Sequence, residues 1–216
     1  MHVIRYCLLS AALATAGSAH ATGLGLRIGS TGLGADLGFA LSDSLTLRVG
    51  YAGYNWSGDY DDDDITYNAK LKLSNLSALA DWKFWRQMRL TAGLVHAKNK
   101  GELAGRSTGG TFTINDVDYA AAEVATLNGN VRLGKNLTPY LGIGYGDIAR
   151  KGLSFYMDLG VMFQGSPSVD LTVNCGTTAR CAQLQNDVEN EVRQLREDLD
   201  KFKYYPVFSL GLAYGW

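Results

Sequence analysis

The stretch YPVFSLGLAYGW, residues 205–216, decides the fold class. Large apolar and aromatic side chains stand on alternate positions, and mostly very small residues lie between them. The large side chains are Phe208, Leu210, Leu212, Tyr214 and Trp216. Because successive side chains of a β-strand point to opposite faces, the pattern predicts a strand with one aromatic, apolar face and one face of small residues.

The same period of two recurs along most of the chain. It is clear in residues 33–41, 45–52, 75–84, 88–94, 125–133, 140–146 and 153–164. The composition agrees with an all-β fold, since 26 Gly and only 3 Pro favour strands and tight turns. We therefore expect one antiparallel β domain over residues 22–216.

Residues 1–21 are typical of a cleaved signal peptide. Arg5 precedes a short apolar run over residues 7–14, and Ala19 and Ala21 form a small-x-small cleavage site, so the mature chain is expected to begin at Thr22. The apolar run is too short to span a bilayer. Loss of Arg5 lowers the formal net charge from -1 to -2, and this near balance gives no indication of a nucleic-acid partner.

The composition of the two strand faces suggests which face meets lipid. The polar face is rich in Gly, Ser and Ala, and the apolar face ends in aromatics such as Tyr51, Trp82, Phe84, Tyr145 and Phe163. Outer-membrane barrels place apolar side chains outside and small or polar ones inside, with aromatic girdles at both interfaces. A water-soluble, lipocalin-like barrel is the alternative, because alternation alone does not say which face is wet.

The chain resembles the small bacterial outer-membrane β-barrel proteins. The resemblance covers the mature chain and rests on the signal, on FALSDSLTLRVGY, LTPYLGIGYG and LSFYMDLGVMFQGSP, and on the aromatic last strand. It implies a Gram-negative outer membrane as location, membrane lipid as surroundings, and recognition of the last strand by the barrel assembly machinery. The family usually ends in Phe, and Trp216 departs mildly from that.

Loop lengths predict the topology. We expect short periplasmic turns at residues 42–44, 85–87, 135–136 and 165–167, and extracellular loops at 59–64 and 99–120. Residues 24–29 and 169–173 as a first and a ninth strand give a transmembrane barrel of ten strands. If both only extend their neighbours, the barrel has eight.

Residues 179–204 break the pattern. Their apolar residues are spaced three and four apart, which predicts one amphipathic helix before the last strand, in the last extracellular loop. We consider two roles, a helix packed over the barrel rim and a coiled-coil or partner-binding element.

Charged residues also occur on the predicted inward face. The members of this lumen charge cluster are Asp36, Arg48, Asp81, Lys83, Arg89, Arg132 and Asp158. They either pair to close the lumen or line a hydrated ion path, whereas the many inward glycines would leave free space. We favour a narrow or largely closed barrel, because carboxylates lie within diagonal reach of arginines across the predicted turns.

Other candidate chemistry is sparse. Cys175 and Cys181 are the only cysteines left after the signal and are expected to form a disulfide, with a transient thiol pair as the alternative. The acidic run at residues 59–64 lacks the spacing of a dedicated calcium loop. His96 is the only histidine of the mature chain, and it shares the lipid-facing parity of its strand.

These patterns predict no catalytic residue, no metal site and no cofactor. The expected function is that of a structural or surface-interaction barrel whose partner protein is unknown. A narrow, porin-like passive channel for small solutes is the alternative, and an outer-membrane enzyme is the third possibility.

Overall fold

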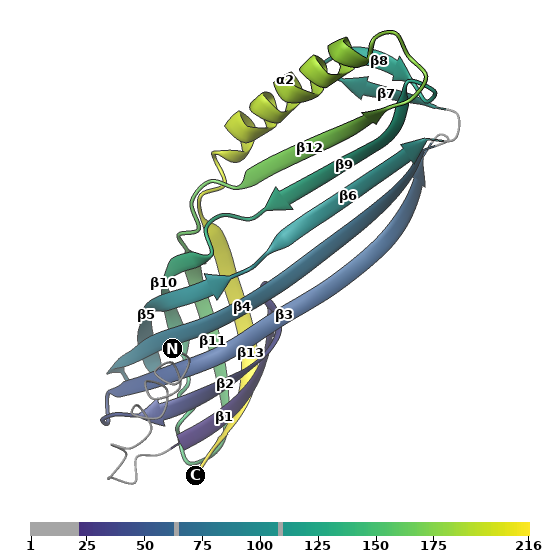
Figure 1. Cartoon of the computed structure of the whole chain (residues 1–216). Coiled ribbons are helices and arrows are strands. Elements are labelled where there is room, and N and C mark those ends of the chain that lie inside the picture. The colour runs from purple at the N-terminus through teal and green to yellow at the C-terminus, as the bar shows by residue number, and fades with distance from the viewer. Residues whose placement is uncertain (1–21, 63–64, 108–109) are drawn as a thin grey trace, which may run out of the picture.

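The computed structural model describes residues 22–62, 65–107 and 110–216. The predicted signal at residues 1–21 and the last two members of the acidic run, Asp63 and Asp64, lie outside the described residues. The described chain forms a barrel and a long extension of the same sheet, which rises from one end of the barrel (Figure 1).

Eight strands pair antiparallel in the barrel, and the pairings lead from β1 back to β1. In the order of pairing these strands are β1 (Thr22–Gly29), β2 (Gly32–Ala40), β3 (Leu45–Asp62), β4 (Ile65–Trp85), β5 (Met88–Ala97), β10 (Leu137–Tyr145), β11 (Gly152–Met162) and β13 (Tyr205–Gly215). The predicted antiparallel barrel is confirmed, with eight strands in the ring.

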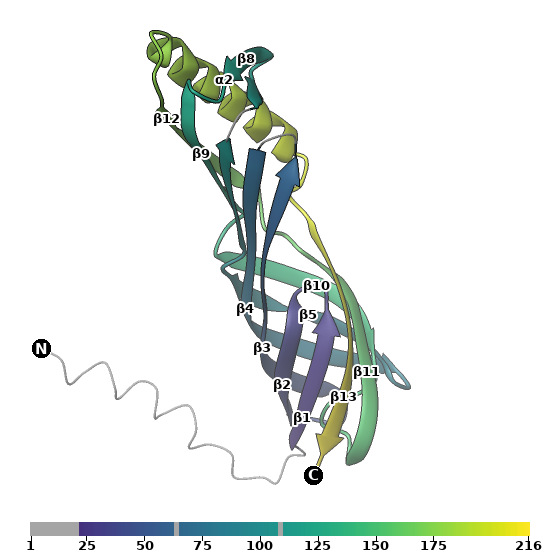
Figure 2. The ribbon, with the colours of Figure 1, turned by 90° about the vertical axis from the view of Figure 1, so that its right-hand side faces the viewer.

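The extension is an open sheet. The outer halves of β3 and β4 continue beyond the ring, where β4 pairs with β6 (Lys100–Ser107). In turn, β6 pairs with β9 (Val124–Arg132), and β9 pairs with β12 (Ser168–Cys175). The ring of pairings is therefore complete only in the barrel. We call residues 53–62 and 65–74, β6, β9, β12 and the elements that cover them the extension (Figure 2).

Three joints carry the chain between barrel and extension without a reversal of direction. β5 runs on into β6, β9 into β10 and β11 into β12, as the antiparallel pairings on both sides require. Asn99 bridges the joint between β5 and β6 to β4. Its side chain accepts a hydrogen bond from Ser74 N at 3.0 Å and donates one to Asn75 at 3.0 Å.

Two predicted periplasmic turns are therefore wrong. Residues 135–136 and 165–167 lie at the joints, at the end of the barrel that carries the extension. The turns at 42–44 and 85–87 lie at the opposite end, together with residues 146–151 between β10 and β11. The prediction failed because a break in a strand and a tight turn have the same short length and the same residue types.

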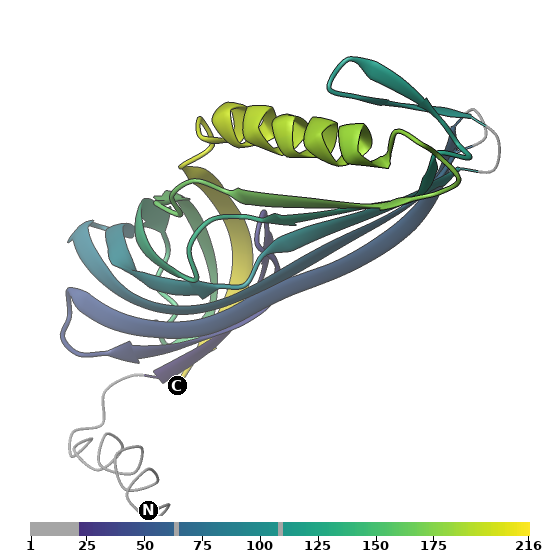
Figure 3. The ribbon, with the colours of Figure 1, turned by 45° about the horizontal axis from the view of Figure 1, so that its top comes forward.

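One helix, α2 (Cys181–Leu199), covers the extension and not the barrel rim (Figure 3). It is shorter than the predicted span of 179–204 at both ends. The predicted loop at 99–120 instead contains β6 and a hairpin of β7 (Thr111–Ile114) and β8 (Val117–Ala120). Leu184 and Val188 of the helix share a core with Phe112 and Tyr119 of this hairpin. No helix in the described part of the chain is long and apolar enough to cross a membrane.

The barrel has its apolar side chains outside. Leu153 is 76% exposed, and the outward residues of the other ring strands are exposed likewise. Large aromatics gather at the short-turn end, namely Trp82, Phe84, Trp85, Tyr145, Tyr214 and Trp216. A soluble barrel would bury this face, so the inverted arrangement is confirmed and the soluble alternative is wrong.

Candidate functional site

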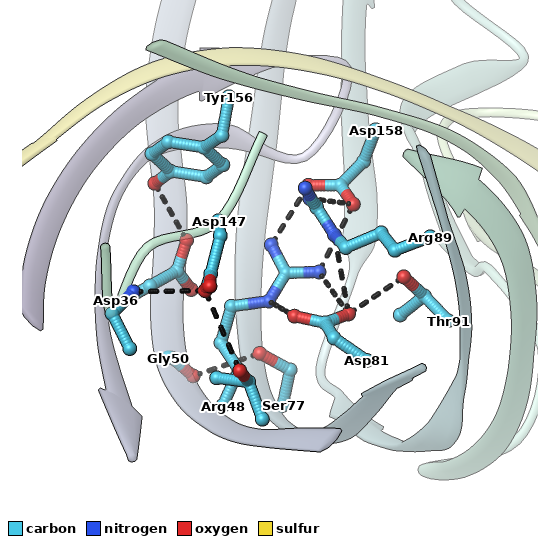
Figure 4. A network of polar contacts seen from close by, with 12 residues as sticks. Asp36, Arg48, Gly50, Ser77, Asp81, Arg89, Thr91, Asp147, Tyr156 and Asp158 are labelled. Carbon is cyan, nitrogen blue, oxygen red and sulfur yellow. Dashed lines mark hydrogen bonds and ion pairs between the residues drawn. The ribbon is translucent and has the colours of Figure 1, made fainter. Parts of the chain in front are cut away.

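Arg48 of β3 lies at the centre of the barrel and is 2% exposed. Its Nη1 and Nη2 donate to the two carboxylate oxygens of Asp158 on β11, at 2.7 and 3.0 Å. Nη2 also donates to Asp81 on β4 at 3.1 Å, and Nε forms an ion pair with the same carboxylate at 3.0 Å. One guanidinium thus joins the walls on both sides of the lumen (Figure 4).

Arg89 of β5 extends this network. Its Nη2 donates to Asp158 at 2.6 Å, and its Nη1 donates to the backbone carbonyls of Tyr145 and Gly146. Asp81 accepts a further bond from the Thr91 hydroxyl at 2.6 Å. All of these side chains are buried, so each charge depends on its partners rather than on water.

Asp36 of β2 forms the second part of the network. It makes an ion pair with Arg27 of β1 at 2.8 Å and accepts a hydrogen bond from the Tyr156 hydroxyl at 2.9 Å. The Tyr156 ring also lies about 6 Å from the guanidinium groups of Arg48 and Arg89. This network therefore holds three arginines, Arg27, Arg48 and Arg89, against three aspartates, Asp36, Asp81 and Asp158, without net charge.

The inward glycines do not leave a pore. A Cβ on Gly50 would lie 1.7 Å from the Asp36 carboxylate, and one on Gly211 would lie 2.5 Å from the Tyr156 ring. The space that these glycines free is taken by the large polar side chains of the network. Glycine is needed at these positions because the side chains of the network lie close to the backbone, and not because the lumen is open.

The connection between β10 and β11 closes the short-turn end of the barrel. Ile148 is buried inside the barrel against Tyr156 and Ala213. Asp147 accepts from Lys83 Nζ at 2.8 Å and from the Thr46 hydroxyl at 3.4 Å. Residues 146–151 thus act as a plug, and the predicted lumen residue Lys83 anchors it.

An apolar layer fills the other end, where Leu79, Val95, Tyr140, Met162 and Val207 pack together. Between this layer and the network, the cavity measures only about 30 Å³. That volume suits a single water molecule rather than a solute path.

The structure brings five predicted members of the lumen charge cluster together, which are Asp36, Arg48, Asp81, Arg89 and Asp158. Arg132 is a correction, because its side chain is 70% exposed on β9 of the extension, where Asp170 lies 3.8 Å away. The alternation of its strand was predicted correctly, but β9 is not part of the ring, and its pairing puts Arg132 on the outward face of the sheet rather than in the lumen. Arg27, Asp147 and Tyr156 were missed, although the inward position of Arg27 between Leu26 and Ile28 was visible in the sequence.

The predicted disulfide between Cys175 and Cys181 is confirmed and joins the end of β12 to the first residue of α2. Arg180 beside it holds Glu123 in a hydrogen-bonded ion pair, and this contact lowers the pKa of Glu123 to about 2. On the hairpin, Asn115 Nδ2 and the Tyr119 hydroxyl both donate to Asp187 of the helix. Burial and the Asp187 contact raise the pKa of Tyr119 to about 12.

Farther along the helix, Arg196 donates to the backbone carbonyl of Val169 on β12. Here an apolar groove of about 390 Å³ opens between Leu195 and Leu199 of α2 and Trp56, Leu71 and Leu103 of the sheet. Trp56 and Leu103 are exposed in it. The extension thus has a surface that can accept an apolar group.

The remaining candidates do not form a reactive site. His96 is half-buried on the outward face of β5, opposite Leu76 and Leu137. In the part of the chain that the structure describes, no three His, Cys, Asp or Glu side chains are grouped so that they could hold a metal ion.

Of the assembly-signal residues, Phe208, Leu210, Leu212 and Tyr214 belong to the outward face of β13, and Trp216 follows directly after the strand and is exposed.

Comparison with known proteins finds matches only at the level of structure. No family profile and no curated sequence matches the chain. Acinetobacter baumannii CarO superposes with a TM-score of 0.61 at 25% identity, over 90% of this chain and 97% of that chain. A. baumannii CarO2 superposes with a TM-score of 0.62 at 20% identity, over 91% and 99%. A major outer membrane protein from Thermus thermophilus fits more loosely, with a TM-score of 0.41 at 17% identity, over 91% and 100%.

Only a barrel that lies in a bilayer can expose an apolar belt around a charged interior, and such barrels are proteins of outer membranes. The shared fold agrees with that location. The chain is therefore a small β-barrel protein of the bacterial outer membrane.

Proposed function

We propose that this protein is a closed structural barrel that holds its extension at the cell surface for interaction with other molecules. The single observation that carries the proposal is the buried network around Arg48, which fills the barrel between the plug and the apolar layer. A path for solutes would require the paired charges to separate inside a water-poor interior, which is costly.

The orientation follows from loop length. Outer-membrane barrels have short periplasmic turns and long extracellular connections. The turns at 42–44 and 85–87 define the periplasmic end, and the extension with α2 then projects outside the cell. Binding is accordingly assigned to the extension, where the groove beside α2 offers an accessible apolar surface.

We further propose that the barrel has no enzymatic role. The interior polar groups are occupied by one another, and His96 faces outward beside apolar residues. A catalytic site needs a group that substrate can reach.

Planar-bilayer recording of the refolded full chain tests the closed state. We expect no current steps of the size that general porins give, with wild-type protein and all loops intact. Replacement of residues 146–151 by a Gly-Ser linker should leave the barrel closed, because the network and the apolar layer lie beyond the plug. Regular ionic currents through wild type would instead support the narrow passive channel.

Biogenesis forms a separate part of the proposal. The outward aromatics of β13 suit recognition by the barrel assembly machinery, and Tyr214 and Trp216 are both exposed. Tyr214→Asp with Trp216→Asp should leave export intact and abolish the heat-modifiable barrel form in outer-membrane fractions. Normal levels of that form in the double variant would contradict this role.

A further inference from the structure

The outward face of the extension carries a row of cations close to the barrel. Lys72 of β4 is paired in register with Lys100 of β6, and Lys100 is paired with Arg132 of β9. All three side chains are exposed. Like charges in directly opposed cross-strand positions repel each other, so this row is unfavourable unless an anion lies between its members.

The carboxylates nearby neutralise the row only in part. Glu102 forms an ion pair with Lys100, and Asp170 lies 3.8 Å from Arg132 but is shared with Arg196 at 3.4 Å. For Lys72 and its neighbour Lys98, the described residues provide no ion pair with a carboxylate. The surrounding cations also act on Glu102. The hydrogen bond and the charge of Lys100 lower the pKa of Glu102, and the charges of Lys70 and Lys72 lower it further.

These cations line a groove at the neighbouring joints between β5 and β6 and between β9 and β10. It has a volume of about 330 Å³ and is lined by Lys72, Lys98, Lys100 and Arg132, with Ser74 and Asn136 among the neutral polar residues. Its lining includes no carboxylate residue. The groove therefore selects for an anionic group with several acceptor oxygens.

The position of the row relative to the lipid belt identifies the anion. On the same outward face, the last apolar row of the barrel contains Tyr51, Leu76 and Leu137, with His96 between the last two. Lys72 lies four residues before Leu76 on β4, which is about 13 Å along a strand. Long cationic side chains at this height reach back to the level where lipid headgroups begin.

We propose that Lys72, Lys98, Lys100 and Arg132 form a binding site for the phosphorylated headgroup of an outer-leaflet glycolipid. The acyl chains lie along the apolar belt below Leu76, and the phosphate oxygens accept hydrogen bonds from the cations of the row. The site goes beyond the proposed function and requires only that the extension is extracellular. It fixes the depth of the barrel in the membrane and gives the cross-strand cations their missing counter-charge.

The test measures binding of diphosphorylated lipid A to the refolded full chain in a zwitterionic detergent, by native mass spectrometry. The triple variant Lys72→Gln, Lys100→Gln, Arg132→Gln should bind about 100-fold more weakly, on the basis of about fivefold for each cation near an anionic surface. Lipid A from which both phosphates have been removed should bind wild type as weakly as the intact lipid binds the variant.

Two control variants separate charge from folding. Lys72→Arg, Lys100→Arg, Arg132→Lys keeps the charges and should retain binding. Arg193→Gln, Lys201→Gln, Lys203→Gln removes three exposed cations from and beyond α2 and should leave affinity unchanged. All variants should keep the heat-modifiable barrel form.

Equal affinity of wild type and the first triple variant would overturn the site. Equal binding of phosphorylated and phosphate-free lipid A to wild type would also overturn it. Full displacement of the lipid by millimolar inorganic phosphate would overturn the assignment to a lipid, because an adequate ligand would then be free phosphate. None of these results depends on conductance, so the site can fail while the closed barrel stands.

Discussion

Strands β3 and β4 pass through both regions of the molecule, and their two faces exchange polarity on the way. In the barrel, Val49 and Leu76 point outward and are exposed, whereas Arg48 and Asn75 are buried inside. In the extension, the outward face carries polar residues such as Lys72, and the opposite face carries Trp56 and Leu71. The backbone pairing is unbroken across the change.

The difference shows that solvent, and not strand geometry, sets the pattern. A strand in lipid must turn apolar groups outward, and the same strand in water must cover them. In the extension that cover is α2 with the β7–β8 hairpin, which packs on the face continuous with the barrel lumen. The position of the switch, near Gly53 and Ser74, marks the membrane boundary on these two strands.

The largest difference in the loss of stability is expected when one arginine is replaced by alanine in each of the two regions. Arg48→Ala leaves Asp81 and Asp158 without their main partner inside the barrel, and should cost about 3 to 5 kcal/mol of unfolding free energy. Arg132→Ala removes an exposed ion pair in the extension and should cost less than about 1 kcal/mol. Urea unfolding of both variants in lipid vesicles measures the two values, and similar losses would remove the distinction.

A charge on the outward face sharpens the comparison further. Leu141→Arg places a cation on the lipid face near mid-barrel, opposite Ala92, and should destabilise by about 2 to 4 kcal/mol. Asn130→Arg lies on the outward face of the extension between Glu102 and Asp170, and should change stability by no more than about 0.5 kcal/mol. The same vesicle titration applies. If Leu141→Arg left the free energy of unfolding unchanged, this face would not meet lipid.

The disulfide should matter to the extension alone. Cys175→Ser with Cys181→Ser opens a short loop and should weaken the attachment of α2 by about 2 kcal/mol on the loop-closure estimate. Hydrogen exchange should rise in α2 and β12, while β1, β2 and β13 keep their protection. Loss of protection in the ring would show that the two regions unfold together.

The smallest effect concerns pH. Because the pKa of Glu123 is lowered to about 2 in the folded chain, its contact with Arg180 stabilises fully above the unfolded pKa of about 4. That contribution is lost as pH falls through about 2. An NMR titration of the Glu123 carboxyl should have its midpoint near 2, and Glu123→Gln should remove the acid-dependent loosening at the start of α2. A midpoint near 4 would contradict the contact.

Much of the barrel could be predicted from local pattern. The alternation in residues such as 153–164 and 205–216 assigned their strand faces, because side-chain direction depends only on the position within a strand. The turns at 42–44 and 85–87 followed from short gaps between such stretches. The continuation of alternation into residues 53–62, with the polarity reversed, was also visible, and it was overlooked because residues 59–64 were interpreted as a loop.

The sequence by itself determined an inverted barrel with charges on its inner face, because period and composition are local properties. Only the tertiary structure decided that Arg48 meets Asp158, 110 residues away, that residues 146–151 plug the barrel, and that β9 and β12 leave the ring. Contacts of this kind depend on which distant strands become neighbours and at what height. Arg132 illustrates the reason: the alternation of its strand was predicted correctly, but strand pairing places it on the outward face of the extension and not in the lumen.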